Sequence, residues 1–259
     1  MLKIALSGAS GRVNQLITQA IIQEFNDIYT ISHAITTKEI TEQLAKFSPQ
    51  IINDVDKLDL TNCDGVIDFS NPELTLQILE KCIKYKKPIV IGTTGFNPEQ
   101  IKSIKNVSNK IPVLFSPNMS LSVNLLFKLV KEVAQQLPQF EAEIIEMHHR
   151  NKKDAPSGTA LQLGKLIADS RNLDFNKYAL YDRSKDDLPR TNSEIGFSVV
   201  RGGDIVGTHE VLFLGDGENL TLKSEITNRM SFAYGALSAF RYIVTQKPGL
   251  YSMEEVLAL

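Results

Sequence analysis

Two adjacent histidines followed by a cluster of cations form the stretch of this chain best suited to chemistry. His148 and His149 stand side by side, and Arg150, Lys152 and Lys153 follow within four residues. Imidazole has an ordinary pKa of about 6.5, so it suits proton transfer near neutral pH. Lysine and arginine side chains favour an anionic ligand such as a carboxylate or a phosphate.

A helix is expected to begin a few residues after this cluster. Pro156 ends any preceding regular element, Ser157 is a good N-cap, and apolar residues recur at helical spacing from Ala160 to Ile167. The first N–H groups of a helix are free and carry partial positive charge. The sequence therefore predicts an anion-binding corner with a histidine pair beside it.

The histidine pair is open to three interpretations. Adjacent side chains on an extended chain point in opposite directions, so one histidine could face the core while the other faces a cleft. The pair could be purely structural, or it could bind a metal with Glu143 or Glu146, although third and fourth ligands are not obvious. We favour proton transfer or anion binding, and we expect no metal.

The first half of the chain alternates strand and helix patterns. Strands are expected at Lys3–Ser7, Ile28–Ile35, Val66–Phe69, Pro88–Gly92 and Pro112–Phe115. Helical patterns lie between them, one of which begins at Asn71-Pro72. This alternation predicts a parallel, doubly wound sheet, and the continuous apolar runs suit strands buried on both faces.

The pattern changes near residue 118. A helix over residues 121–137 leads to a strand over 142–147 and then to the histidine run. Residues 195–227 are typical of antiparallel strands, residues 173–193 of a surface loop, and residues 232–244 of a last helix. We therefore predict an α/β nucleotide-type domain followed by an α+β domain with a mixed or antiparallel sheet.

The turn after the first strand is a candidate dinucleotide site. Residues 8–13, Gly-Ala-Ser-Gly-Arg-Val, follow a strand and open a helix, which is the context that cradles a pyrophosphate. The match is incomplete, because Ser10 and Val13 occupy the second and third glycine positions. An ordinary strand-to-helix turn is the alternative, and Arg12 adds a cation that favours phosphate.

Loops after the later strands extend this candidate site. Residues 92–95 and 116–119 follow buried strands, where ligands bind in such folds, although each could also be a simple turn. The second strand ends without the acid that normally binds the adenine ribose. Thr36 could bind the ribose instead, and Lys38 or Arg12 could favour a 2′-phosphate, so the choice between NAD and NADP stays open.

The composition excludes several classes of protein. A net charge of −2 and a pI of about 6.1 argue against a nucleic-acid or membrane-surface binder. No apolar stretch approaches the roughly 20 residues of a membrane span, and we expect no signal peptide. The two cysteines have no metal-site spacing, which favours a reduced, cytoplasmic protein.

The histidine run closely resembles the signature of the 4-hydroxy-tetrahydrodipicolinate reductase (dihydrodipicolinate reductase) family. That signature is Glu-x-His-His, a Lys four residues past the first His, and Asp-Ala-Pro-Ser-Gly-Thr-Ala, all present in residues 146–160. Residues 8–12, 92–95, 117–120 and 201–207 match further family motifs, so the resemblance extends along the chain.

The resemblance implies a fold, a reaction and an assembly. It implies a Rossmann-like domain of residues 1–118 and 228–259 and a substrate-binding and oligomerisation domain of residues 119–227, assembled as a homotetramer. The implied reaction uses NADH or NADPH to reduce a small dicarboxylate. The substrate is 4-hydroxy-tetrahydrodipicolinate in its dehydrated dihydrodipicolinate form, and the product is tetrahydrodipicolinate, in lysine and diaminopimelate biosynthesis.

The resemblance also implies residue roles. His148 and Lys152 would be the acid/base pair, and His149, Ser157, Gly158 and Thr159 would hold the substrate. The cofactor would be lined by Gly8, Ala9, Ser10, Gly11, Arg12, Val13, Thr36, Gly92, Thr93, Thr94, Ser116, Pro117, Asn118 and Met119.

This sequence departs from the family pattern near the cofactor. Asn14 replaces a common glycine, so the first helix could pack differently, and Thr36 and Thr37 replace an acidic and basic pair. Two alternatives remain. One is another NAD(P)-dependent enzyme, such as an amino-acid or semialdehyde dehydrogenase; the other is a non-catalytic nucleotide-binding regulator.

Overall fold

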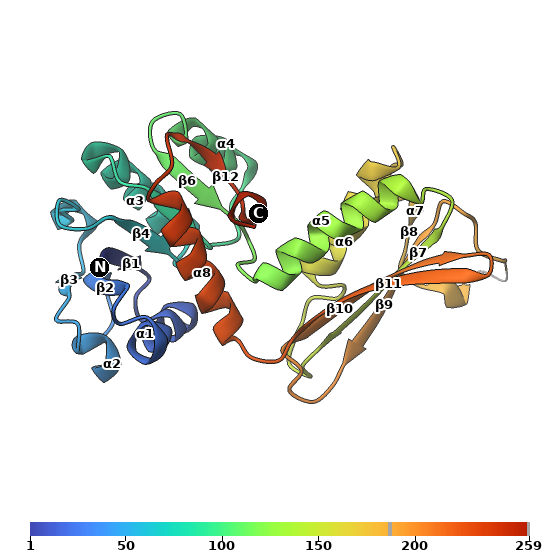
Figure 1. Cartoon of the computed structure of the whole chain (residues 1–259), viewed down its shortest axis with the longest axis horizontal. Helices are drawn as coiled ribbons and strands as arrows, with labels where there is room; N and C mark the ends of the chain where they lie inside the picture. The colour runs from blue at the N-terminus through green and yellow to red at the C-terminus, as the bar shows by residue number, and fades with distance from the viewer. Residues whose placement is uncertain (186–187, 258–259) are drawn as a thin grey trace. The chain divides into compact units, whose positions relative to one another are not determined.

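The computed structural model describes residues 1–185 and 188–257, and the chain divides into two compact units. Unit 1 comprises Met1–Leu121 and Met230–Leu259, and unit 2 comprises Ser122–Arg229. Each unit contains a β-sheet of its own (Figure 1). In the described ranges, no helix combines the length and the apolar character needed to cross a bilayer.

Unit 1 is built on a seven-stranded parallel sheet. The strands are β1 (Leu2–Ser7), β2 (Tyr29–Ile35), β3 (Gln50–Ile52), β4 (Gly65–Asp68), β5 (Ile89–Ile91), β6 (Pro112–Phe115) and β12 (Gly249–Tyr251). Their order is β12-β6-β5-β4-β1-β2-β3, and every pairing is parallel. The order reverses between β1 and β4, which is where ligands bind in doubly wound sheets. The predicted α/β fold is confirmed.

Helices cover both faces of this sheet because successive strand side chains alternate. Ile4 and Leu6 of β1 pack in one apolar cluster with α1 (Arg12–Glu24) and α8 (Met230–Ile243). Ala5 faces the opposite cluster. That second cluster includes residues of α3 (Pro72–Tyr85) and α4 (Pro98–Val107). The shorter helices of unit 1 are α2 (Glu42–Ala45), η1 (Val55–Lys57) and α9 (Met253–Val256).

Two strands of this sheet were missed by the sequence patterns. Both β3 and β12 are three residues long, and each adds an edge to the sheet. β5 is equally short but is a continuous apolar run, whereas β3 contains Gln50 and β12 contains Gly249, so their patterns do not separate a strand from a turn. Their pairing with β2 and β6 is decided by tertiary contact.

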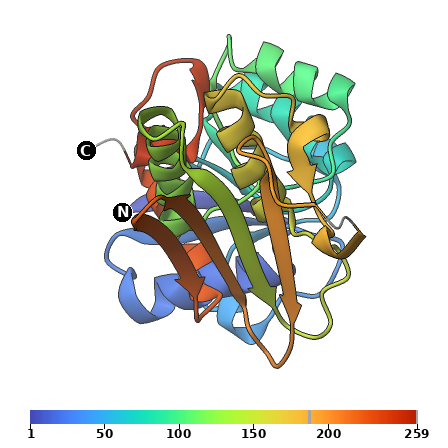
Figure 2. The ribbon, with the colours of Figure 1, turned by 90° about the vertical axis from the view of Figure 1, so that its right-hand side faces the viewer.

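Unit 2 contains a five-stranded mixed sheet in the order β11-β10-β7-β9-β8. The strands are β7 (Glu141–His148), β8 (Ala179–Leu180), β9 (Ile195–Arg201), β10 (Gly207–Gly215) and β11 (Glu218–Ile226). One face packs against α5 (Leu121–Gln136) and α6 (Gly158–Ser170) around a shared apolar cluster (Figure 2). The predicted mixed sheet is confirmed.

Two local predictions in unit 2 are corrected. β9 pairs in parallel with β7, so the expectation of antiparallel strands over 195–227 is wrong for its first strand. The predicted loop at 173–193 contains α7 (Phe175–Tyr178), β8 and η2 (Arg183–Lys185), while residues 186 and 187 lie outside the described residues. Register with a neighbouring strand, rather than local pattern, creates β8.

The central strand β7 turns one row of side chains inward. The row begins with the buried apolar residues Ala142 and Ile144 and ends with the buried polar residues Glu146 and His148. On the neighbouring strand β10, His209 stands opposite Glu146. The apolar core of unit 2 therefore gives way to a polar cluster at the carboxyl end of β7.

Candidate functional site

Glu146 is the centre of a buried hydrogen-bond cluster in unit 2. Its side chain accepts two hydrogen bonds from the Arg201 guanidinium, at 2.7 and 2.8 Å. It also bonds to His148 Nδ1 at 2.6 Å and accepts from the Ser157 backbone N–H at 2.9 Å. Glu146 is only 1% exposed, so these donors replace water around its carboxylate. We call Glu146, His148, Ser157, Arg201 and His209 the Glu146 cluster.

The cluster keeps Glu146 ionised. Burial alone would raise the pKa of its carboxyl group, but hydrogen bonds from Arg201, His148 and Ser157 outweigh burial, and the pKa is lowered. The two terminal nitrogens of the Arg201 guanidinium each donate to one oxygen of the Glu146 carboxylate, which fixes the plane of the carboxylate. A fixed anion therefore lies against one ring nitrogen of His148.

His148 is buried on one side and open at one atom. The residue is 8% exposed, and burial lowers its pKa despite the opposing effect of Glu146. In the part of the chain that the structure describes, no hydrogen bond reaches Nε2 of this ring. His149 is half-buried. The two adjacent histidines therefore differ in burial.

His209 completes the cluster as a second buried histidine. Its Nε2 lies 2.9 Å from Ser157 Oγ, and its ring meets that of His148 edge-on with centroids 5.1 Å apart. Burial, reinforced by the charge of His148, lowers the pKa of His209 to about 4. His209 is thus neutral near pH 7, and its buried Nδ1 has no hydrogen-bond partner among the residues that the structure describes.

The start of α6 adjoins this cluster. Ser157 is the N-cap of the helix, as predicted, and its Oγ accepts from the Ala160 N–H. Gly158, the first helical residue, is exposed, and a Cβ added there would meet nothing within 4 Å. Thr159 is half-buried. The helix start therefore offers N–H groups beside open space, as an anion site requires.

The two lysines of the run differ. Lys152 is partly buried, with its side chain 21% exposed, and its Nζ lies 2.9 Å from Asp154 Oδ2. Its charge contributes to lowering the pKa of His148. Lys153 is exposed, as expected for a solvated charge. Of the two lysines, Lys152 is therefore the one whose charge affects the pKa of His148.

In unit 1 the glycine turn leaves the start of α1 open. Gly8 has a φ of +72°, and a Cβ there would lie 2.3 Å from the Phe69 carbonyl oxygen, so only glycine fits. Gly11 is the N-cap and provides no side-chain cap, and the first turn of α1 has no acidic residue. Its N–H groups suit a phosphate. Arg12 is exposed, while Ala9 is buried and Val13 half-buried against the core.

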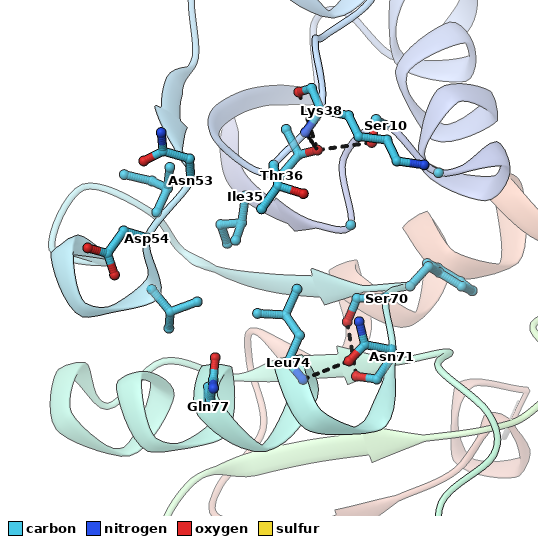
Figure 3. Close-up of a pocket in the computed structure, with 16 residues that line it drawn as sticks. Ser10, Ile35, Thr36, Lys38, Asn53, Asp54, Ser70, Asn71, Leu74 and Gln77 are labelled. Atoms are coloured by element: carbon cyan, nitrogen blue, oxygen red, sulfur yellow. Dashed lines mark hydrogen bonds between the residues drawn. The ribbon is translucent and has the colours of Figure 1, made fainter.

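A pocket of about 560 Å³ lies beside this turn, at the carboxyl ends of β1, β2 and β4 (Figure 3). Ser10, Thr36 and Lys38 line one side, and Ser10 Oγ lies 2.9 Å from Thr36 Oγ1. Ser70 and Asn71 line the side across from them. Further lining residues are Gly8, Gly11, Ile35, Thr37, Ile52, Asn53, Asp54, Val55, Phe69, Leu74 and Gln77.

A second buried carboxylate, Asp68, organises the loops at this edge of the sheet. Asp68 is fully buried and accepts hydrogen bonds from the hydroxyls of Ser70, Thr75 and Thr93, at 2.6, 2.6 and 2.7 Å. Thr93 also accepts from the Ser70 N–H at 2.8 Å. We call these four residues the Asp68 cluster. The Thr93 hydroxyl is thus bound within the protein.

The remaining cofactor candidates lie on the loops after β5 and β6. Gly92 packs against the Phe69 ring, whose nearest atom would lie 2.1 Å from an added Cβ. Thr94 is exposed, as is Pro117. Ser116 Oγ donates to the Asn118 carbonyl at 2.8 Å, whereas the Met119 side chain is 2% exposed and belongs to the core. Neither loop lines the pocket beside the glycine turn.

Asn14, which replaces the family's common glycine, binds the turn. Its side-chain amide donates to the carbonyls of Ser7 and Gly8, at 2.8 and 2.9 Å, and the residue is fully buried. The first helix is therefore attached to the end of β1 through a side chain as well as through its backbone.

Both parts of the chain match models of one family. The dihydrodipicolinate reductase N-terminal model matches residues 2–119, and the C-terminal model matches residues 122–257. The chain belongs to the dihydrodipicolinate reductase family. A 4-hydroxy-tetrahydrodipicolinate reductase of Syntrophotalea carbinolica is 41% identical, and one of Nitratiruptor sp. is 40% identical, each covering all of both chains.

Solved structures agree with this family membership. A dipicolinate-bound dihydrodipicolinate reductase from Paenisporosarcina sp. TG-14 has a TM-score of 0.78 and 25% identity, covering 97% of each chain. A scyllo-inositol dehydrogenase from Lactobacillus casei with NAD(H) and scyllo-inositol has a TM-score of 0.59 at 12% identity. It covers 99% of this chain and 93% of its own, and this second likeness concerns the fold alone.

The sequence missed several partners that the fold provides. Local pattern marks Glu146 as a possible metal ligand and as part of the family signature, whereas in the structure its carboxylate bonds to Arg201, His148 and Ser157. Asp68 and His209 were not singled out. One signal was available: Glu146 and His148 are two residues apart on a strand, so they share a face. Arg201 lies 55 residues from Glu146, so no local spacing pairs the two, and the sequence marks Arg201 through the family motif of residues 201–207.

Proposed function

We propose that this protein reduces 4-hydroxy-tetrahydrodipicolinate, through its dehydrated dihydrodipicolinate form, to tetrahydrodipicolinate. The family match across both units carries this proposal. The reaction belongs to lysine and diaminopimelate biosynthesis and uses NADH or NADPH. Unit 1 acts as the dinucleotide-binding domain, and unit 2 as the substrate-binding and oligomerisation domain.

Unit 1 fits a dinucleotide. The open start of α1 between Gly8 and Val13 receives the pyrophosphate, and the pocket that contains Ser10 and Thr36 receives the adenosine part. The loops at Gly92–Thr94 and Ser116–Met119 bind the nicotinamide part. The nicotinamide, when bound, supplies the hydride.

Unit 2 binds the dicarboxylate and protonates it. His149, Ser157, Gly158 and Thr159 hold the substrate at the start of α6, where the partial positive charge of the helix N-terminus attracts a carboxylate. A reduced ring carries excess electron density and needs a proton. His148 Nε2 and Lys152 Nζ are the atoms that hold and deliver this proton.

Cofactor preference follows from the residues around the pocket. No carboxylate extends from the end of β2 to repel a 2′-phosphate, since Thr36 stands there and bonds to Ser10. Lys38 lines the same pocket and is exposed. Thr36 and Lys38 support the use of NADPH as well as NADH, and the carboxylate of Asp54, which also lines the pocket, acts against a phosphate. We also propose that it works as a homotetramer in the cytoplasm.

The buried thiols argue against an aldehyde dehydrogenase mechanism. Cys63 and Cys82 are free and buried. Burial raises the pKa of Cys63 to about 11 and that of Cys82 well above its ordinary value. Neither thiol forms a nucleophilic thiolate near neutral pH. The two cysteines therefore do not provide the nucleophile that a semialdehyde dehydrogenase needs.

The test is the oxidation of NADPH and NADH at 340 nm with freshly generated substrate, for the wild type and for Lys152→Ala. The wild type should turn over with both cofactors. Lys152→Ala should lose about 100-fold or more in kcat, because a proton donor contributes that much, while the dissociation constant for NADPH stays near the wild-type value. Substrate-independent binding of NADPH without turnover would instead identify a regulator, and an unchanged kcat would remove Lys152 from the mechanism.

A further inference from the structure

The Glu146 cluster contains more than the proposed acid/base pair needs. Glu146 and Arg201 form a bidentate ion pair beneath His148, and neither has been given a role in the reaction. Buried ion pairs of this kind are no more stabilising than well-packed apolar residues. The pair lies against one ring nitrogen of His148, the histidine proposed to exchange protons. This position suits a function in fixing which nitrogen of His148 carries hydrogen.

The hydrogen bonds define which nitrogen of His148 carries hydrogen. An ionised carboxylate only accepts, so the 2.6 Å contact between Glu146 Oε2 and His148 Nδ1 requires a hydrogen on Nδ1. In the neutral ring, the lone pair then lies on Nε2. Arg201 donates to both oxygens of the Glu146 carboxylate, so the carboxylate is held in one orientation.

The opposite side of the ring is kept open by a glycine. Gly207 begins β10, and a Cβ at this position would lie 3.0 Å from His148 Nε2 and 3.4 Å from Cδ2. Such a methyl group would stand against the atom that must meet the substrate. The absence of a side chain at residue 207 is therefore part of the same arrangement.

We infer that Glu146, fixed by Arg201, is a positioning residue that holds His148 with hydrogen on Nδ1, and that Gly207 leaves Nε2 open to the substrate. This inference rests on the proposed function for its catalytic consequence. Its structural part, the tautomer of His148, is independent of any reaction.

Glu146→Gln is the decisive variant. Oε1 of Glu146 accepts from Arg201 and Ser157, which can only donate, whereas Oε2 accepts from Arg201 and from His148, whose ring can become an acceptor. The oxygen of a glutamine would therefore take the place of Oε1, and Arg201 Nη1 would keep its bond to the Val200 carbonyl. The NH₂ group of the glutamine would then face His148 Nδ1 and donate to it. The hydrogen on the ring would have to move to Nε2, which reverses the tautomer without removing the side chain.

The experiment combines ring NMR with kinetics. Two-bond ¹H–¹⁵N spectra of uniformly ¹⁵N-labelled protein, with His148→Gln to assign the signal, report the tautomer in the absence of ligands. We expect an Nδ1–H ring in the wild type and an Nε2–H ring in Glu146→Gln. The variant should lose about 100-fold or more in kcat, as a reversed tautomer does in other enzymes, with an unchanged NADPH dissociation constant.

The pH dependence supplies a readout that a merely structural role would not move. Glu146, Arg201, His209 and Lys152 all act on the His148 ring. Loss of the Glu146 charge removes the influence that raises the pKa of His148, so the His148 limb of the kcat profile should move to lower pH. The same titration is followed by NMR without substrate.

Two matched substitutions separate the effect of the His148 tautomer from the effect of substrate access to Nε2. Gly207→Ala should keep the Nδ1–H tautomer yet lose about tenfold or more in kcat, since proton transfer needs contact at Nε2. Gly202→Ala, whose added methyl meets nothing within 4 Å, should behave as the wild type. Glu141→Gln, on the same strand as Glu146 but partly exposed, should leave the tautomer unchanged.

The outcomes are distinguishable. A wild-type His148 with hydrogen on Nε2 overturns the inference whether or not any variant folds. An unchanged kcat and pH profile in a folded Glu146→Gln with a reversed tautomer also overturns it. A wild type that shows the Nδ1–H ring but never oxidises NADPH with substrate refutes the proposed function and leaves the tautomer assignment standing.

Discussion

The two units each bury one carboxylate near the carboxyl end of a central strand, and they satisfy it in different ways. Within the described residues, the Asp68 carboxylate in unit 1 accepts only from the neutral hydroxyls of Ser70, Thr75 and Thr93. Glu146 in unit 2 accepts from a guanidinium, an imidazole and a backbone N–H. Both are almost completely buried.

The difference matches what each unit has to do. Hydroxyl partners link the end of β4, the first turn of α3 and the loop after β5, so Asp68 sets the geometry of loops for which we propose cofactor binding. Charged and titratable partners couple Glu146 to His148, the group for which we propose proton exchange. Neutral donors suit a carboxylate that only orients, and ionic donors suit one that controls protonation.

The largest expected contrast comes from removing Arg201. Arg201→Leu leaves Glu146 buried without its counter-charge, which should lower the free energy of unfolding by about 3 to 5 kcal/mol. Urea unfolding at pH 7 measures this. The double variant Arg201→Leu/Glu146→Gln should recover part of the loss, because the unpaired charge is gone. Additive losses would show that the ion pair is not coupled.

A pH-dependent contrast of intermediate size comes from His209. Its pKa of about 4 in the folded protein lies below the value of about 6.5 in an unfolded chain. The folded state therefore binds fewer protons between these values, and stability is lost as pH falls from about 6.5 towards 4. This amounts to about 3 kcal/mol, at 1.36 kcal/mol per pKa unit.

His209→Gln should remove that part of the pH dependence. Urea unfolding at pH 7 and pH 4.5 should show a smaller difference for the variant than for the wild type. Thr75→Val, in the Asp68 cluster, serves as the control because no histidine is involved there. An equal pH slope in wild type and His209→Gln would mean that His209 titrates normally.

The smallest expected effect is the loss of one neutral donor. Thr75→Val deletes the hydroxyl that donates to Asp68 and to the Asn71 carbonyl, at little change in volume. Two donors to Asp68 remain, so the free energy of unfolding should fall by only about 1 to 2 kcal/mol. Thr75→Ser should restore most of it. A loss as large as that of Arg201→Leu would erase the contrast between the clusters.

Much of the fold followed from local pattern. Buried parallel strands such as β1 and β5 are short apolar runs, and helix starts such as Ser157 and Asn71 carry their own capping side chains. The edge strands β3 and β12 are as short as β5 but include a glutamine or a glycine, and β8 has only two residues, so none of the three has a clear strand pattern. They are strands because a neighbour pairs with them.

The sequence by itself determined the candidate chemistry: a histidine pair, a lysine four residues on, and a helix start that its own serine caps. These features depend on residues close together in the chain. Tertiary structure decided the partners that control them, since Arg201 lies 55 residues from Glu146, and His209 lies 52 from Ser157. A hydrogen-bond partner across a sheet depends on strand order and register, and only the folded sheet fixes both.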